Sequence, residues 1–486
     1  MGNPARRIVI VGGGISGLAA TLAIQEESQR LNETFECTIL EGQDRLGGKV
    51  LTHRVDDFVI EGGPDSFLTS KPWALELCEK LGLADQLINT NKANSQTFCF
   101  TKGRMRELPQ GLVSFVPTRL GALFSGGLIS PLGMLRMGWE WFVPRYTNLE
   151  HDESLASFFR RRLGIEAFDH FIEPLVAGIY AGDANVLSVK STFPRFYDLE
   201  QQYGSLMKGI RAQRRDTPPP SAQPQPQRTI FTTLRGGLGD LIQALVKQLS
   251  SQGATLRTGH QVHELTTDTT STRSTYTVVL DNHERLLADE VILATPAYVS
   301  AKLLEPLQPS VASLLSQIPY CSTATISLAF RHRDVETSIR GFGFVVPRIE
   351  GRAMLAATWT SLKWPNRANA QHSLIRCYIG GQGREQILQE SDASLVAYVR
   401  EQLQEMADIS CDPLFSEVYR WDRAMPQYVC GHGQRLQDIR SLMCTLEGMH
   451  LTGAAFEGLG LPDCIREGTR VGSALVRAYH ERRQNE

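Results

Sequence analysis

The chain has 486 residues, a formal net charge of −2 at pH 7, and a hydrophobic fraction of 42%. This length provides enough material for two or three domains with a large core. The nearly neutral charge argues against nucleic acid or a strongly anionic surface as a partner, so we expect a small-molecule ligand and no nucleic acid.

The nine cysteines are dispersed and form no CxxC pair. This usage is typical of reduced thiols, so we expect no metal site, no disulfide framework and a cytoplasmic location. The chain enters its first strand after a few polar residues, and we therefore expect no signal peptide. The apolar stretch 121–135 is interrupted by Pro131 and is too short to span a bilayer. Core packing is the interpretation we favour for it, and peripheral membrane contact stays open.

The N-terminal stretch from Arg6 to Ala20 predicts a buried strand, a tight turn and a helix. Its glycines follow the pattern GxGxxG, in which one glycine forms the turn, one admits a pyrophosphate and one packs the helix against the strand. These residues are Gly12, Gly14 and Gly17. The helix would direct free N–H groups and its positive dipole end at the phosphates.

A lone GxGxxG occurs in many loops, and its context decides its meaning. A second apolar stretch, Phe35 to Leu40, ends at Glu41, where a dinucleotide site places its ribose-binding acid. An acid here favours a free ribose diol over a 2′-phosphate. The alternative is a glycine turn followed by an unrelated glutamate.

Two further glycine turns follow. In the first, Arg45 precedes the doublet Gly47-Gly48, so the backbone can approach a cofactor while the arginine pairs with its phosphate. A surface hairpin with a solvated arginine is an equally good interpretation of this segment. The second turn, Gly62-Gly63, follows a strand from Phe58 and suits a backbone wall beside a ligand.

The remaining elements follow in chain order. We expect a helix from Trp73 to about Gly82, a hairpin at Lys102-Gly103, and mostly helical structure over 117–202, whose aromatic residues we interpret as core. The proline-rich segment 216–228 predicts a solvated loop without chemistry. Further strands are expected at 229–233, 255–257, 261–265, 276–280 and 289–295, with helices after Gly239 and over 393–406, and an antiparallel sheet within 323–379.

The C-terminal stretch repeats the order of the first motif: a strand from His450, a glycine-rich turn and a helix through Tyr479. The start of this helix would face a second anionic or electron-rich part of a ligand. A purely structural loop is the alternative.

Five segments together carry a resemblance to a known family. They are Arg45–Thr52, Gly63–Ser66, Pro174–Asp183, the run from Arg420-Trp421 through Met425–Tyr428 to Gly431-His432, and Glu457–Ile465. With the first glycine motif, they resemble the FAD-dependent amine-oxidase-like superfamily and, within it, the oxygen-dependent porphyrinogen oxidases of haem synthesis. The likeness covers nearly the whole chain except 216–228.

The resemblance implies an α/β fold in three parts. A Rossmann-like βαβ FAD-binding domain is built from 1–90, 229–300 and 418–486, a mixed or antiparallel substrate-binding sheet domain spans 301–417, and a helical subdomain spans 91–215. It also implies that FAD lies along the first glycine turn, with its ribose at Glu41, its adenine at Val262 and its ring near Gly63–Ser66 and the C-terminal turn. The implied FAD-binding residues are Gly12, Gly13, Gly14, Ile15, Ser16, Gly17, Glu41, Gly42, Arg45, Gly48, Lys49, Gly63, Pro64, Asp65, Ser66, Val262, Ala454, Leu459, Gly460 and Leu461.

The implied substrate is a porphyrinogen held over the flavin, with Gly178 lining its cavity and O2 as the electron acceptor. The flavin performs the redox chemistry, so no catalytic side chain is expected. Lys71, Arg348 and Arg352 are candidate cations for the propionates, with ordinary surface charges as the alternative. Thr97 stands where members acting on protoporphyrinogen carry an arginine, which favours coproporphyrinogen III over protoporphyrinogen IX.

Two rival functions remain. Another flavin oxidase, such as an amine oxidase or carotenoid desaturase, would use the same fold, although Cys464 is not in the usual context for covalent flavin attachment. A GDI-like binding protein without catalysis would have lost the phosphate-binding glycines, which are intact here. Contacts with other haem-pathway enzymes and the oligomeric state stay open.

Overall fold

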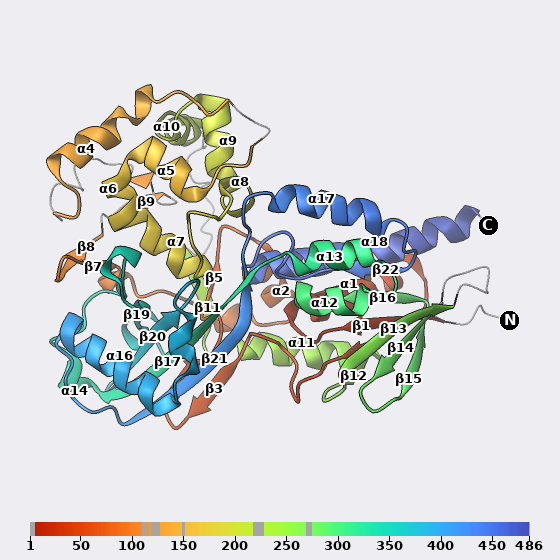
Figure 1. Cartoon of the computed structure of the whole chain (residues 1–486). Helices are drawn as coiled ribbons and strands as arrows, with labels where there is room; N and C mark the ends of the chain where they lie inside the picture. Colours follow the sequence, from red (N-terminus) through yellow and green to blue (C-terminus); the bar gives the residue numbers. More distant parts are fainter. Residues whose placement is uncertain are drawn as a thin grey trace.

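The computed structural model describes residues 5–108, 112–113, 116–117, 127–147, 151–216, 228–268 and 275–485. Residues 121–126 of the apolar stretch 121–135, and nearly all of the proline-rich loop 216–228, lie outside these residues. Figure 1 shows a helical unit, a unit built on a large, mostly antiparallel sheet (the sheet unit), and an elongated unit that contains both ends of the chain. In the described residues, no helix is both long and apolar enough to cross a bilayer.

A five-stranded parallel sheet organises the elongated unit (Figure 1). Ile10 of the central strand pairs with Ile39 on one side and Ile292 on the other. Alternate residues of this strand face two cores, because successive side chains point to opposite faces of a sheet. Ile8 and Ile10 pack against the helices α1, α11 and α18, while Val9 and Val11 pack against α12, α13, α17 and a three-stranded meander. The strand order is β12 (Thr255–Arg257), β2 (Phe35–Leu40), β1 (Arg6–Val11), β16 (Glu290–Leu293) and β22 (Met449–Leu451).

The structure confirms the helices expected after the first glycine turn, from Trp73, after Gly239 and at the C-terminus, whereas the helices over 297–304, 309–316 and 432–443 were not predicted. The helices are α1 (Ile15–Leu31), α2 (Trp73–Lys80), α11 (Gly239–Ser251), α12 (Ala297–Leu304), α13 (Pro309–Ser316), α17 (His432–Met443) and α18 (Leu461–Asn485). The meander consists of β13 (Val262–Asp268), β14 (Thr275–Leu280) and β15 (Arg285–Ala288). A hairpin of β3 (Thr52–Val55) and β4 (Phe58–Glu61), and a small sheet of β5 (Phe67–Leu68), β11 (Phe231–Leu234) and β6 (Leu87–Asn89), complete it.

Two glycines of α18 let it lie directly on α1. A Cβ on Gly468 would stand 2.3 Å from the carbonyl oxygen of Ser16, and one on Gly472 would stand 2.2 Å from that of Ala20. Both distances are far below van der Waals contact, so only glycine admits this approach. The packing brings the first turns of the two helices together at the carboxyl edge of the sheet.

The sheet unit contains a seven-stranded mixed sheet, in which β18 and β7 pair in parallel and the other neighbours pair antiparallel, and its strand order crosses the expected domain boundaries. The hairpin β7–β8 comes from residues that the sequence placed in the helical subdomain, yet β7 pairs with β18. Conversely, α12 and α13 pack on the parallel sheet although most of their residues fall within the expected sheet domain. The strands run in the order β21 (Phe415–Pro426), β17 (Tyr320–Arg331), β20 (His372–Gly380), β19 (Met354–Trp359), β18 (Gly343–Val345), β7 (Phe98–Thr101) and β8 (Arg104–Glu107), and α14 (His332–Val335), α15 (Thr360–Lys363) and α16 (Asp392–Ala407) accompany them.

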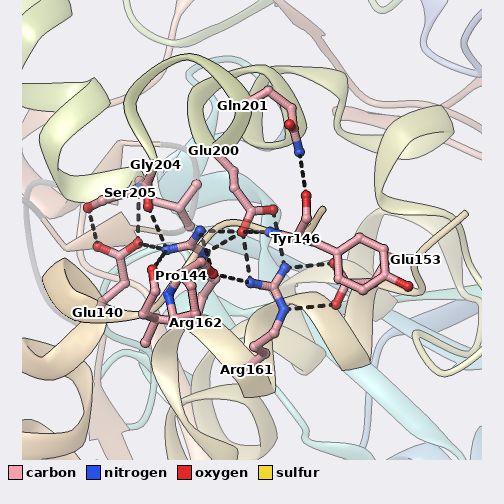
Figure 2. A network of polar contacts seen from close by, with 12 residues as sticks. Glu140, Pro144, Tyr146, Glu153, Arg161, Arg162, Glu200, Gln201, Gly204 and Ser205 are labelled. Atoms are coloured by element: carbon pink, nitrogen blue, oxygen red, sulfur yellow. Dashed lines mark hydrogen bonds and ion pairs between the residues drawn. The ribbon is translucent and has the colours of Figure 1, made fainter. Parts of the chain in front are cut away.

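The helical unit is held by a buried charge network that Figure 2 shows from close by. The Arg162 side chain is fully buried and pairs with Glu140 at 3.3 Å and with Glu200. Arg161 bridges Glu200 and Glu153, each at 2.7 Å. The main helices of this unit are α4 (Pro131–Gly138), α5 (Leu155–Leu163), α6 (Ile165–Ala167), α7 (Glu173–Tyr180), α8 (Val189–Thr192), α9 (Pro194–Tyr203) and α10 (Leu206–Asp216), with β9 (Leu112–Val113) paired to β10 (Val116–Pro117) beside them.

Candidate active site

The first glycine turn leaves the start of α1 open. Gly12 has φ of +109°, and a Cβ on Gly17 would lie 2.1 Å from the carbonyl oxygen of Gly12, so both positions require glycine. The helix has no side-chain N-cap and no acid in its first turn. A Cβ on Gly14 would meet no atom within 4 Å. Uncapped N–H groups therefore face open space, which fits a pyrophosphate.

Glu41 is joined to this turn. Its Oε2 accepts a hydrogen bond of 2.8 Å from the Gly13 N–H, and its Oε1 accepts one of 2.9 Å from Gln43. The carboxylate is therefore oriented at the end of β2, where a ribose diol would lie beside the pyrophosphate. Val262 is 7% exposed at the start of β13 and belongs to the same core as Leu40.

The Arg45 guanidinium shapes its own loop. It donates to the carbonyl oxygen of Gly48 at 2.6 Å and to that of Val50 at 3.2 Å. The loop then packs on the first turn, because the Gly47 N–H donates to the Gly13 carbonyl at 2.8 Å. Next to it, Lys49 is half-buried, and burial lowers the pKa of its ammonium. Phosphate pairing by Arg45 stays a prediction.

The turn at Gly62-Gly63 is held by the large sheet. Three donors converge on the Gly62 carbonyl oxygen: Thr325 Oγ1 at 2.9 Å, Trp421 Nε1 at 2.8 Å and Arg376 Nη2 at 3.1 Å. A Cβ on Gly63 would stand 1.7 Å from the carbonyl oxygen of Lys49, so glycine is required there too. Three strands of the sheet unit thus position the backbone predicted to face the flavin ring.

Asp65 extends the same turn, between Pro64 and Ser66. It accepts hydrogen bonds from Ser66 Oγ at 2.6 Å and from Trp364 Nε1 at 3.1 Å, and it forms an ion pair of 3.1 Å with Lys363. Burial alone would raise its pKa, but the charges of Lys363 and Arg376 outweigh burial and hold the pKa of Asp65 below its ordinary value. The carboxylate therefore serves to fix this turn to the sheet unit.

The C-terminal glycine turn, which we call the glycine loop (residues 453–460), is braced by one tyrosine. The Tyr428 hydroxyl donates to the Ala454 carbonyl at 2.6 Å and accepts from the Gly458 N–H at 2.9 Å. Its ring is buried and stacks on His432 with centroids 4.4 Å apart. Sequence reasoning noted the Met425–Tyr428 motif but did not assign this role. Leu459 packs against the helical unit, and Gly460 precedes Leu461, the first residue of α18.

The expected cavity residue Gly178 lies on α7. Gly178 and its neighbour Ile179 are exposed, although the rest of α7 is largely buried. A Cβ on Gly178 would meet no atom within 4 Å. This part of the helix therefore presents free space that a large ligand can occupy.

The three cations proposed for propionates each have a protein partner. Lys71 pairs with the buried Asp463 at 2.5 Å. Arg348 donates to the carbonyl oxygens of Gln382 and Gly182 at 3.0 and 3.2 Å. The third, Arg352, pairs with Glu405 and bonds Gln402 on α16. Their roles toward a substrate stay predictions.

The sequence profile described as flavin containing amine oxidoreductase matches residues 15–476. The chain belongs to this flavin-containing amine oxidoreductase family. It is 38% identical over 480 residues to the coproporphyrinogen III oxidase of Bacillus subtilis, covering 98% of this chain and 99% of that one. The chloroplastic protoporphyrinogen oxidase of Nicotiana tabacum is 31% identical, covering 98% and 86%. A crystal structure from Exiguobacterium sp. 255-15 has a TM-score of 0.85 and 30% identity, covering 98% and 100%.

Membership of the flavin-containing family confirms an oxidoreductase with FAD as cofactor and the expected α/β fold. The glycine cradle fits this cofactor, because its uncapped helix start and close backbone contacts leave space where a pyrophosphate binds. The residues that would hold the FAD phosphates lie in the first glycine turn, and those near its ring lie in the Gly62–Ser66 turn and the glycine loop.

Proposed function

We propose that this protein oxidises coproporphyrinogen III to coproporphyrin III in haem biosynthesis, with O2 as the electron acceptor. The observation that carries the proposal is the full-length likeness to coproporphyrinogen III oxidases. The intact glycine cradle for FAD and the open space at Gly178 on α7 support it. The alternative substrate is protoporphyrinogen IX, because relatives named for that activity match nearly the whole chain at 30–31% identity.

Thr97 supports the choice of coproporphyrinogen. It lies directly before β7, and its carbonyl accepts a hydrogen bond of 2.8 Å from the Leu108 N–H. Its short side chain provides no cation at a position where arginine is associated with a propionate of protoporphyrinogen. A substrate with four propionates depends less on that single contact.

The chemistry that FAD supplies when bound is two-electron oxidation of a bridging carbon, and three such rounds with O2 yield the aromatic macrocycle and three molecules of peroxide. The chain's own residues orient the reactants. Gly62 and Gly63, fixed by the sheet, and the glycine loop, fixed by Tyr428, form rigid backbone walls, while α7 bounds the substrate space. Preorganised walls of this kind exclude water and fix the reacting atoms.

The decisive experiment mixes the oxidised holoprotein anaerobically with coproporphyrinogen III or protoporphyrinogen IX and follows flavin bleaching. We expect coproporphyrinogen to reduce the flavin at least ten times faster. Equal rates would contradict the substrate preference. Consumption of only an amine or a carotenoid precursor would contradict the proposed function.

We also propose a cytoplasmic protein with peripheral membrane contact through α4 and the turn that follows it. Leu132, Leu135, Trp139 and Phe142 are 78, 72, 63 and 74% exposed at spacings of three, four and three residues. Such a stripe of leucines and aromatics suits the interface of a bilayer. All nine cysteines are free, as expected in a reducing compartment.

Co-sedimentation with anionic lipid vesicles tests this contact. Wild type should sediment with vesicles, and the variant Leu135→Glu/Phe142→Glu should stay in solution with unchanged flavin reduction. A wild type that fails to bind vesicles would exclude the contact.

A further inference from the structure

Helix α7, which presents open space at Gly178, is held at both ends by one arginine of the sheet unit. Glu173, the first residue of the helix, is buried and accepts a hydrogen bond of 2.9 Å from the Arg348 N–H. Its carboxylate also lies 3.5 Å from Nε of the same arginine. Past the other end of the helix, the Gly182 carbonyl accepts a hydrogen bond of 3.2 Å from Arg348 Nη2. Arg348 therefore spans α7 from its start to its end.

Further contacts fasten the same helix to the sheet unit. After the helix, the Gln382 N–H donates to the Ala181 carbonyl at 2.8 Å, and the Gln382 amide oxygen accepts from the Asp183 N–H at 3.1 Å. Before the helix, the buried His170 lies in a π-helical turn, and its Nδ1 is 3.0 Å from the hydroxyl of Thr101 on β7. Such turns are frequent at functional sites. The sheet unit thus fixes the chain on both sides of α7.

Strand β20 connects this attachment to the turn that is predicted to face the flavin ring. Arg376 on β20 donates to the Gly62 carbonyl at 3.1 Å, and the residues just past the end of the strand contact the exit of α7. Among them, Gly381 has φ of +80°, and a Cβ there would stand 2.6 Å from the Ala181 carbonyl oxygen, so the position requires glycine. One strand therefore positions both the Gly62 turn and α7.

We propose that Arg348, together with Glu173, is a positioning residue that sets the distance between α7 and the flavin-facing turn and so selects the porphyrinogen that fits between them. The inference rests on the proposed function and names what sets the size of its substrate space. Arg348 acts through α7 and not as a propionate ligand, because both of its Nη atoms donate to carbonyl oxygens and its Nε faces a carboxylate. A displacement of about 1 Å in a positioning element can lower a rate about 100-fold.

The test compares R348M, which keeps the apolar stem of the side chain, with E173Q, which removes only the charge. The measured quantity is the ratio of the rates at which saturating coproporphyrinogen III and protoporphyrinogen IX reduce the flavin of the holoprotein without oxygen. We expect R348M to lower this ratio at least fivefold and E173Q at least twofold, with an unchanged FAD Kd. The double variant should be no worse than R348M, because the two side chains act as one unit.

The matched control is E153Q. Glu153 has the same side-chain exposure as Glu173, 8%, but its ion pair of 2.7 Å with Arg161 lies within the helical unit. Its rate ratio should equal that of the wild type, since a general loss of folded protein lowers both signals in proportion. If Arg348 instead binds a propionate, R348M raises KM for coproporphyrinogen III, whereas E173Q frees the guanidinium and leaves KM equal or lower. That result, or an unchanged ratio in R348M, would overturn the proposal.

Amide hydrogen exchange separates this inference from the proposed function. In the holoprotein, exchange over residues 173–182 should be at least fivefold faster in R348M and in E173Q than in the wild type or E153Q, because the helix loses its attachment. If the wild type oxidises neither porphyrinogen, the proposed function fails, and if it oxidises both equally, the substrate preference fails. In either case the exchange rates decide whether Arg348 holds α7, and unchanged exchange in both variants would refute it.

Discussion

At the scale of single residues, one phenol oxygen connects both ends of the glycine loop. Removing it in Tyr428→Phe leaves the Gly458 N–H without its acceptor and the Ala454 carbonyl without its donor. We expect the free energy of unfolding to fall by about 1–2 kcal/mol and the FAD Kd to rise about fivefold to tenfold. Thermal unfolding and flavin fluorescence titration measure the two effects.

Tyr276→Phe is the matched control for this variant. Tyr276 is also buried, and its hydroxyl donates to the Glu447 carbonyl at 2.6 Å, in the meander away from the glycine loop. It should show a similar loss of stability with an unchanged FAD Kd. Equal FAD Kd values for the two variants would show that Tyr428 has no positioning role.

Glu61 gives the protein a pH-dependent stability. It is 2% exposed, and burial raises its pKa to about 7 despite Arg367 at 3.5 Å and hydrogen bonds from Thr52 and Leu238. A raised carboxyl pKa means that the folded state binds the proton more tightly. Its stabilising contribution is therefore complete below the unfolded pKa of about 4.3 and is lost as the pH rises through about 7.

In Glu61→Gln, the neutral amide removes this titration. The wild type should lose up to about 3 kcal/mol more than the variant between pH 4.5 and pH 8, as measured by the Tm or denaturation midpoint of the holoprotein at each pH. Parallel pH profiles for the two proteins would contradict the prediction.

At the scale of elements, the charge network in Figure 2 stabilises the packing of α5 against α9 and joins Glu140 to the turn before α10. Arg162→Met leaves Glu140 and Glu200 buried without their shared cation. We expect a loss of about 3–5 kcal/mol in unfolding free energy. Arg161→Gln is the control, because that guanidinium is 26% exposed and should contribute about 1 kcal/mol or less. Equal losses in chemical denaturation would refute this ranking.

The sequence predicts elements best where their causes are local. The first glycine turn, the hairpin at Lys102-Gly103 and the C-terminal helix each follow from glycine positions and apolar periodicity. The sequence pattern alone does not show that β7 pairs with β18 as well as with β8. β18 lies more than 240 residues later in the chain, and pairing partners depend on the tertiary fold.

The same limit applies to the site. The glycines and Glu41 are predictable from spacing, since one local motif contains them. The protein partners of Lys71, Arg348 and Arg352 are not predictable in this way. Each depends on chain segments that are brought together only by folding.

At the scale of the whole molecule, the sheet unit and the FAD-binding unit meet at the Gly62 carbonyl. Thr325 on β17 and Trp421 on β21 each donate to it, alongside Arg376 on β20. The double variant Thr325→Val/Trp421→Phe removes two of the three donors. Valine keeps the volume of threonine, and phenylalanine keeps an aromatic ring that is three heavy atoms smaller than tryptophan. We expect the double variant to lose about 1–3 kcal/mol of unfolding free energy and to release FAD several times faster, because the turn that faces the flavin ring loses its attachment to the sheet.

Ser327→Ala tests whether this effect belongs to the Gly62 contact. Ser327 lies two residues beyond Thr325 on the same face of β17, and its buried hydroxyl has no hydrogen-bond partner. Removing that hydroxyl should leave the rate of FAD release unchanged and keep or raise the Tm, since an unsatisfied polar group is lost. FAD release measured after dilution, together with thermal unfolding, compares the variants. Normal FAD release in the double variant would show that the two units are joined for cofactor binding at another point.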